Sequence, residues 1–238
     1  MRPRVPAASN ADRGCRLNRV LGLRWYSHFD VLNMPLSPSK IVCVGRNYRA
    51  HARELGNDVP KEPLLFLKPP SAIIRDGDAI VLPTVSTHVE FEGEIGLVLG
   101  RRLRKGTEAD ALAALSQVVA LNDVTARDLQ KSDGQWARAK GMDTFLPLGE
   151  PATAPSDLSS ITLVTRVNGV ERQRATAADM VFSIPMLLAY ISQYITLEAG
   201  DVVATGTPAG TKALHAGDVV EVELVGLSSV SNPVVSGV

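Results

Sequence analysis

Hydrophobic and polar residues alternate over much of this chain from residue 40 onward, and such alternation is typical of β-strands. Residues 88–100 show it most clearly, because Val, Phe, Ile and Leu are interleaved there with Glu and Gly. Asn168-Gly169 follows another apolar run and predicts a hairpin turn. The other short apolar runs that predict strands are 41–44, 64–67, 79–82, 117–122, 161–167, 202–205 and 219–225.

Helical spacing is confined to a few segments. Residues 49–55 predict a short helix that ends at Gly56, and residues 107–115 and 184–194 predict two more. Residues 134–147 are polar and punctuated by glycine, which indicates an active-site loop. Because strands outnumber helices and are linked mostly by hairpins or irregular loops, the pattern predicts a β-rich α+β fold and not a doubly wound parallel sheet.

The first 33 residues differ in composition, with six arginines, only two aspartates and no clear periodicity. A basic, acid-poor segment suits an organellar transit peptide, but this one lacks a convincing amphipathic helix and is short of serine. A secretory signal is excluded because no continuous apolar run follows the arginines. Met34 is an alternative natural start. We expect residues 1–35 to be a poorly ordered basic extension and residues 36–238 to be one folded domain.

The composition narrows the class of protein. A chain of 238 residues can bury a sizeable core, and 25 basic against 25 acidic residues indicate neither a nucleic-acid nor a membrane partner. No apolar run approaches the roughly 18 residues needed to span a bilayer. The two cysteines, Cys15 and Cys43, make no disulfide framework or zinc site. A cytoplasmic enzyme or binding protein is the expected class.

Candidate chemistry begins with the glutamates of the 88–100 segment. Side chains alternate between the two faces of a strand, so Glu92 and Glu94 point the same way, and Glu90 has the same parity. Like charges so close together repel, and an unpaired buried carboxylate is costly. The pattern therefore predicts a hard divalent cation with oxygen ligands. The alternative is the solvated face of an edge strand.

Other polar residues allow two interpretations each. Asp123 follows a predicted strand, a common position for ligand groups, but it suits the cap of a helix over 125–131 equally well. Lys140 by itself reads as a surface charge. His51 and Glu54 lie three residues apart on one helical face. They are either a surface ion pair or a base with the carboxylate that orients it.

Several well-known motifs are absent from the sequence. The glycine-rich segment 206–212 lacks the spacing of a phosphate-binding P-loop, and no Gly-x-Gly-x-x-Gly follows a strand, so nicotinamide chemistry has no support. The chain also has neither a Gly-x-Ser-x-Gly elbow nor a His-Glu-x-x-His zinc helix.

A set of short segments, each weak alone, is highly specific in combination. In sequence order they are Val42-Cys43-Val44-Gly45-Arg46-Asn47-Tyr48 with His51 and Glu54, Leu65-Phe66-Leu67-Lys68-Pro69, Phe91-Glu92-Gly93-Glu94, Asn122-Asp123-Val124-Thr125-Ala126-Arg127-Asp128, Gly134-Gln135-Trp136 with Lys140, and Thr205-Gly206-Thr207-Pro208. Through these segments the chain from Ile41 onward resembles the fumarylacetoacetate hydrolase family, in its branch of short bacterial and mitochondrial members.

The resemblance implies a fold, a metal, a partner and a set of site residues. It implies a mixed β-sandwich roll in which residues 36–238 are a single catalytic domain, and it implies a homodimer. The cofactor would be Mg²⁺ or Mn²⁺, with Glu92, Glu94 and Asp123 as the metal ligands. The implied catalytic residues are His51 and Glu54, a dyad on a lid, and Lys140. The implied substrate-binding residues are Arg46, Arg127, Gln130 and Thr207.

The chain departs from the usual family pattern at two places. Residues 211–213 read Thr-Lys-Ala where relatives usually have Val-Gly-Pro, and Leu146 stands where many have cysteine. Neither place is a proposed ligand, so both bear on substrate shape and loop geometry more than on chemistry.

The activity implied by the resemblance is cleavage of a carbon–carbon bond in a small 2-oxo acid. This would be hydrolysis of an acylpyruvate or fumarylpyruvate, or decarboxylation of oxaloacetate, through a metal-bound enolate. Lys140 would add positive charge where negative charge develops, and His51, oriented by Glu54, would activate the water for hydrolysis. The alternatives are a keto–enol isomerase of the 2-hydroxyhepta-2,4-diene-1,7-dioate type in aromatic catabolism, and a metal-binding relative without activity.

Overall fold

The structure is a computed structural model that describes residues 36–54, 56, 58 and 60–237. Residues Ser37–Val238 form one compact unit. The basic extension expected over residues 1–35 lies outside the described residues, so its poor order stays a prediction. In the described part of the chain, no helix has the length and apolar character required to cross a membrane.

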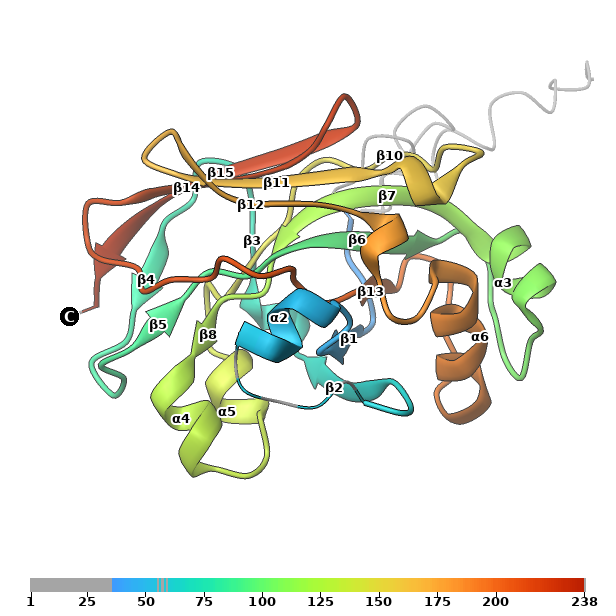
Figure 1. Cartoon of the computed structure of the whole chain (residues 1–238), viewed down its shortest axis with the longest axis horizontal. Coiled ribbons are helices and arrows are strands. Elements are labelled where there is room, and N and C mark those ends of the chain that lie inside the picture. Colours follow the sequence, from blue (N-terminus) through green and yellow to red (C-terminus); the bar gives the residue numbers. More distant parts are fainter. Residues whose placement is uncertain (1–35, 55, 57, 59, 238) are drawn as a thin grey trace, which may run out of the picture. The chain divides into compact units, whose positions relative to one another are not determined.

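The first sheet has six strands in the order β10-β7-β6-β13-β1-β2 (Figure 1). β1 and β13 run parallel, whereas the other neighbouring strands run antiparallel, so the sheet is mixed. Its strands are β1 (Ile41–Gly45), β2 (Leu64–Lys68), β6 (Gly93–Leu99), β7 (Leu115–Asn122), β10 (Ala152–Thr153) and β13 (Val202–Ala204).

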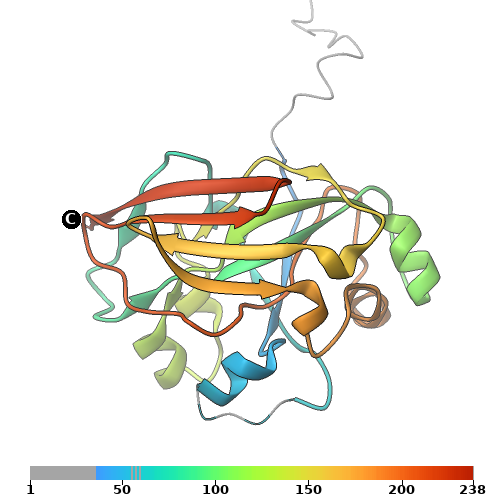
Figure 2. The ribbon, with the colours of Figure 1, turned by 45° about the horizontal axis from the view of Figure 1, so that its top comes forward.

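A second sheet has five strands in the order β12-β11-β14-β15-β4 (Figure 2, yellow to red for four of them). The predicted Asn168-Gly169 turn joins β11 to β12, and both residues have the positive φ that such a turn requires. The strands are β4 (Ile80–Leu82), β11 (Thr162–Val167), β12 (Val170–Thr176), β14 (Val219–Leu224) and β15 (Ser228–Ser236). Two small pairs complete the strands: β3 (Ile73–Ile74) with β9 (Leu146–Pro147), and β5 (Val89–Glu90) with β8 (Thr125–Ala126).

The main hydrophobic core lies between the two sheets. It joins apolar side chains of the first sheet, such as Ile95 and Leu97, to those of the second, such as Leu163 and Val222. Burial of this apolar area is the principal stabilising term for such a layered domain. The helices are α2 (Arg49–Glu54), α3 (Glu108–Ala114), α4 (Arg127–Ser132), α5 (Ala137–Lys140) and α6 (Ile184–Tyr194), with 3₁₀ turns η3 (Pro70–Ala72), η4 (Leu158–Ser160) and η5 (Ala177–Asp179).

The predicted fold class is confirmed, because the described chain is rich in strands, has few helices and contains mixed sheets. Three local expectations were wrong. The 88–100 segment is not one strand: it breaks at residues 91–92, where the backbone leaves β8 and begins to pair with β7. The 134–147 segment contains α5 and β9, and the last strand, β15, had no counterpart in the predicted elements. For the strands, tertiary pairing decides what local pattern leaves open.

Candidate active site

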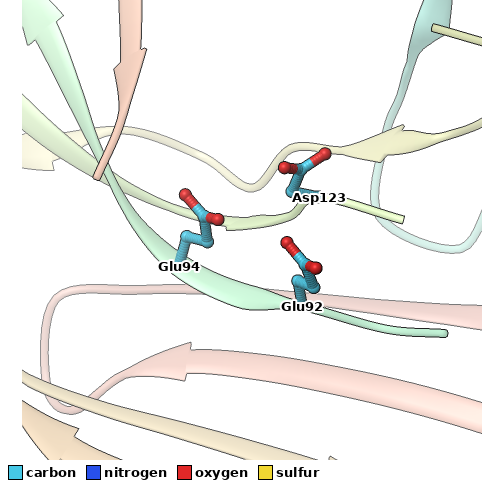
Figure 3. A group of neighbouring side chains, drawn as sticks. All are labelled: Glu92, Glu94 and Asp123. Atoms are coloured by element: carbon cyan, nitrogen blue, oxygen red, sulfur yellow. The ribbon is translucent and has the colours of Figure 1, made fainter. Parts of the chain in front are cut away.

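Three carboxylates meet at one end of the β6–β7 pair. Glu94 lies on β6, Glu92 comes directly before β6, and Asp123 follows the last residue of β7 (Figure 3). One oxygen of each side chain lies within 4.8 Å of the others. Glu92, Glu94 and Asp123 are only 4%, 1% and 0% exposed, respectively, and β6 is an interior strand. The interpretation as a solvated edge strand is therefore wrong.

Glu90 does not join this cluster, although it has the parity of the other two glutamates. The interruption of the strand at residues 91–92 carries it onto β5. Its carboxylate instead accepts a hydrogen bond from Arg127 Nε at 2.7 Å and lies 2.9 Å from His88 Nε2. The third carboxylate of the cluster is Asp123, which directly follows β7, and not a residue of the same strand.

Asp123 is not a helix cap. The cap residue of α4 is Ala126, and no side chain caps that helix. The Asp123 carboxylate instead accepts hydrogen bonds from two lysines, at 2.6 Å from Lys68 Nζ and at 2.7 Å from Lys140 Nζ. The backbone N–H of Asp123 also donates to the carbonyl of Glu92 at 2.8 Å, which fixes the two acidic residues side by side.

Basic side chains surround two of the three carboxylates. Lys140 Nζ lies 2.7 Å from Glu92 Oε2 as well as from Asp123, and Arg127 Nη1 forms an ion pair with Glu92 Oε1. Lys68, Arg127 and Lys140 are all buried. Lys140 is therefore not the surface charge that its sequence context alone indicates. Such buried charges persist only because each is paired.

Glu94 differs from its neighbours because no basic side chain among the described residues bonds to it. Its Oε2 accepts a hydrogen bond from the backbone N–H of Gly206 at 2.7 Å. Burial, and then the negative charges of Asp123 and Glu92, raise the pKa of Glu94. Burial acts in the same direction on Glu92, but Arg127 and Lys140 outweigh it and lower the pKa of Glu92. A cation beside Glu94 would relieve this repulsion.

Helix α2 carries His51 and Glu54 at the same cavity as the carboxylates. His51 Nδ1 lies 3.3 Å from Glu54 Oε2, and the imidazole is buried. A plain surface ion pair does not describe a buried ring. The Glu54 oxygens also accept the backbone N–H of Gly210, at 3.1 and 3.2 Å, so the helix is tied to the segment that carries Thr207.

The cavity has a volume of about 500 Å³, and every site residue expected from the sequence lines it. Two expected substrate contacts already have partners within the protein. Arg127 binds Glu90, Glu92 and the side-chain oxygen of Gln130, the last at 2.9 Å. The Thr207 hydroxyl donates to the carbonyl of Gly93 at 2.9 Å. The substrate-binding roles of these residues stay predictions.

The sequence interpretation gave no role to several residues that build the site. Lys68 is buried beneath Asp123, and the rings of Phe66 and Trp136 meet edge to face at 5.2 Å on the cavity wall. A signal was present, because Phe66 and Lys68 share one face of the strand by parity. Gln173 gave no such signal, since its partners are distant in sequence.

Comparison with known proteins identifies the family of the chain. Residues 40–235 match the family described as "Fumarylacetoacetate (FAA) hydrolase C-terminal". The chain is 42% identical over 198 residues to mitochondrial oxaloacetate tautomerase FAHD1 of Arabidopsis thaliana, covering 81% of this chain and 89% of that protein. It is 37% identical over 233 residues to oxaloacetate tautomerase YisK of Bacillus subtilis, covering 91% and 77%.

Solved structures agree with this assignment. The crystal structure of 2-hydroxyhepta-2,4-diene-1,7-dioate isomerase from Mycobacterium marinum superimposes with a TM-score of 0.78 at 40% identity, covering 85% of this chain and 76% of that one. At that level of identity both the fold and the family are shared.

Proposed function

Since the chain belongs to the fumarylacetoacetate hydrolase family, we propose that it is a divalent-metal-dependent enzyme that interconverts the keto and enol forms of a small 2-oxo acid. One observation carries the proposal: a buried group of three carboxylates shares its cavity with Lys140 and the His51–Glu54 pair. The relatives named oxaloacetate tautomerase support oxaloacetate, or a close analogue, as the substrate.

The donor set fits Mg²⁺ or Mn²⁺. Both are hard cations that prefer carboxylate and water oxygens, and Glu92, Glu94 and Asp123 offer only such oxygens. A carboxylate oxygen has two lone pairs, so one that accepts a hydrogen bond from Lys140 can also ligate an ion. When bound, the ion would supply a Lewis acid toward the 2-oxo group.

The cavity also has groups for an acidic substrate. Arg46 and Lys131 line it, and the side chain of neither makes a hydrogen bond or ion pair with another residue in the described part of the chain. Both are therefore available to a carboxylate of the ligand. This favours a 2-oxo acid, and a diacid in particular, over a neutral compound.

The chain's own residues supply the proton transfer. If His51 Nδ1–H donates to Glu54, the other ring nitrogen, Nε2, keeps its lone pair and can accept a proton from the carbon next to the keto group. Glu54 then stabilises the resulting imidazolium. Lys140 places positive charge beside the acidic cluster, where the enolate oxygen would carry negative charge until it takes up a proton to become the enol.

The test is a tautomerisation assay on the purified chain. Enol oxaloacetate should be converted to the keto form faster than in buffer, as followed by ultraviolet absorbance. Removal of divalent ions with a chelator and dialysis should abolish the acceleration, and Mg²⁺ or Mn²⁺ should restore it. Full activity in samples shown by elemental analysis to lack divalent metal would contradict the proposal.

Carbon–carbon bond cleavage is the second candidate, because a buried histidine oriented by a carboxylate can also activate water. The same samples should be assayed for pyruvate released from oxaloacetate and from acetylpyruvate. A hydroxylated dienedioate, the compound class in the name of the Mycobacterium marinum structure, belongs in the same panel. Release of pyruvate faster than tautomerisation would reverse the order of the two candidates.

A further inference from the structure

The backbone of Gly93, between two of the three clustered carboxylates, lacks a strand partner on one side. β13 pairs with β6 only from Gly96 to Val98, and Thr205 N–H donates to the carbonyl of Ile95 before the chain departs. Gly93 is the first residue of β6, so it lies outside this ladder, and it is buried. A buried peptide group without a hydrogen-bond partner is costly, so something else must bond to it.

Two side chains take the place of the missing strand. Gln173 Oε1 accepts the N–H of Gly93 at 3.1 Å, and the hydroxyl of Thr207 donates to the carbonyl of Gly93 at 2.9 Å. Gln173 Nε2 donates in turn to Thr207 Oγ1 and to the carbonyl of Pro208, both at 2.8 Å. The bonds form a closed ring through Gly93, Gln173 and Thr207.

The ring leaves little freedom at this position. The Gly93 N–H can only donate and the Pro208 carbonyl can only accept, so the orientation of the Gln173 amide is fixed. Gln173 is 1% exposed. A Cβ on Gly93 would lie 1.9 Å from Thr165 Oγ1, so the second sheet presses directly on this peptide. Gly93 therefore cannot rotate without breaking the ring or moving β11.

We propose that Gln173 is a positioning residue for the metal site: through Gly93 and Thr207 it sets the separation and orientation of Glu92 and Glu94. Gln173 comes from β12 of the second sheet and is not among the residues that line the cavity, so it acts only through others. The inference rests on the proposed metal site. Groups that orient metal ligands in this way typically change metal affinity about 10- to 100-fold when mutated.

Metal selectivity separates positioning from a merely structural role. Mg²⁺ demands near-ideal octahedral geometry at about 2.0–2.1 Å, whereas Ca²⁺ accepts flexible geometry at about 2.3–2.6 Å. If Gln173 sets the carboxylate spacing, its loss should weaken Mg²⁺ binding by about 10- to 100-fold and Ca²⁺ binding less. A general loosening of the fold would weaken both to the same extent.

The experiment is calorimetric titration of the full chain with MgCl₂ and with CaCl₂. Gln173→Met keeps the side-chain length but removes all three bonds, and Thr207→Val removes the hydroxyl. Each should lower Mg²⁺ affinity, and the double variant should lose little more than either single, because the ring is already broken. Thr207→Ser keeps the hydroxyl and should retain wild-type Mg²⁺ affinity. The comparison of Thr207→Ser with Thr207→Val therefore tests the ring even if Gln173→Met does not fold.

Gln193→Leu is the matched control, because Gln193 also donates to two backbone carbonyls but lies on α6, exposed. It should leave both affinities unchanged. Wild-type Mg²⁺ affinity in a folded Gln173→Met variant, equal losses for the two ions, or additive losses in the double variant would each overturn the inference. If the wild-type chain itself binds neither ion, the proposed metal-dependent function fails together with the inference. The outcomes in the variants, by contrast, overturn only the role of Gln173.

Discussion

At the scale of single residues, His51 should matter for proton transfer and not for metal binding. Its Nδ1 pairs with Glu54, and His51 is not one of the three residues whose oxygens group to hold an ion. General-base catalysis typically contributes about 100- to 10,000-fold, so His51→Ala should lower kcat for tautomerisation within that range. Mg²⁺ affinity by calorimetry should stay within about twofold of wild type. A large loss of affinity would instead show that His51 supports the metal site.

Lys68 should be a stabilising partner whose loss a metal ion can partly offset. Its ammonium is fully buried and bonds to Asp123 and to the carbonyl of Val124. Removing one partner of a buried pair typically costs about 3–5 kcal/mol, so Lys68→Met should lower the free energy of unfolding by that order. Because Mg²⁺ would compensate the buried Asp123 charge that Lys68 no longer pairs, it should stabilise the variant more than the wild type. Denaturant unfolding with and without MgCl₂ measures this.

The matched control for Lys68 is Lys40→Met, which removes a partly exposed ion pair with Asp201 outside the cavity. It should cost far less stability, with no added response to Mg²⁺. Lys68→Met stability that is equal to wild type would contradict the assigned role.

At this scale, sequence parity was enough to place Glu92 and Glu94 on one face, and the structure brings them together. It was misleading for Glu90, because parity holds only while a strand is continuous. For Lys68, parity gave the strand face that it shares with Phe66 but not its partner Asp123, which is 55 residues away. Gln173 gave no signal, since its partner Gly93 is 80 residues away.

At the scale of elements, helix α2 depends on the conformation of the loop that holds Glu54. Gly210 has φ of +108°, and a Cβ there would lie 2.1 Å from the carbonyl oxygen of Arg172. Gly210→Ala should therefore displace the loop and remove the N–H that fixes Glu54. We expect lower kcat, and Gly217→Ala is the control, because Gly217 also has positive φ but nothing within 4 Å of the added Cβ.

The start of helix α4 is held to the preceding loop by Asp128. Burial acts against ionisation, but hydrogen bonds from Ser86, Thr87 and Leu129 lower the pKa of Asp128 to about 2. A depressed folded-state pKa means that these bonds stabilise the protein above the unfolded-state pKa of about 4 and lose that effect as the pH falls toward 2. Asp128→Asn should be less stable than wild type at neutral pH, and the gap should narrow near pH 2. A gap that is constant with pH would contradict this account.

Element prediction succeeded where a segment is buried on one side by its own pattern, as in α6, whose apolar residues recur at helical spacing. It failed for α5 and for the break at residues 91–92, which both place side chains in the cavity. Local rules fail most often at functional sites, and these two segments carry Lys140 and Glu92.

At the scale of the whole molecule, the pattern of short strands predicted a β-rich α+β fold, which the sheets confirm. It did not predict the strand order, because the parallel pairing of β1 with β13 joins segments about 160 residues apart. The family resemblance, and not the periodicity, implied the mixed β-sandwich roll.

The last prediction concerns the first 33 residues and the assembly. The match to the family begins at residue 40, and the compact unit begins at Ser37, so a chain that starts at Met34 should keep the whole cavity. We expect it to fold, to retain tautomerase activity and to form the homodimer that the family resemblance implies. Light scattering after size-exclusion chromatography measures the mass, and the full-length chain is the control. Because described residues of the two sheets form the main core, we expect thermal unfolding of both chains at the same temperature. Loss of the dimer only in the shortened chain would show that the arginine-rich segment takes part in assembly, and a monomer in both would refute the homodimer itself.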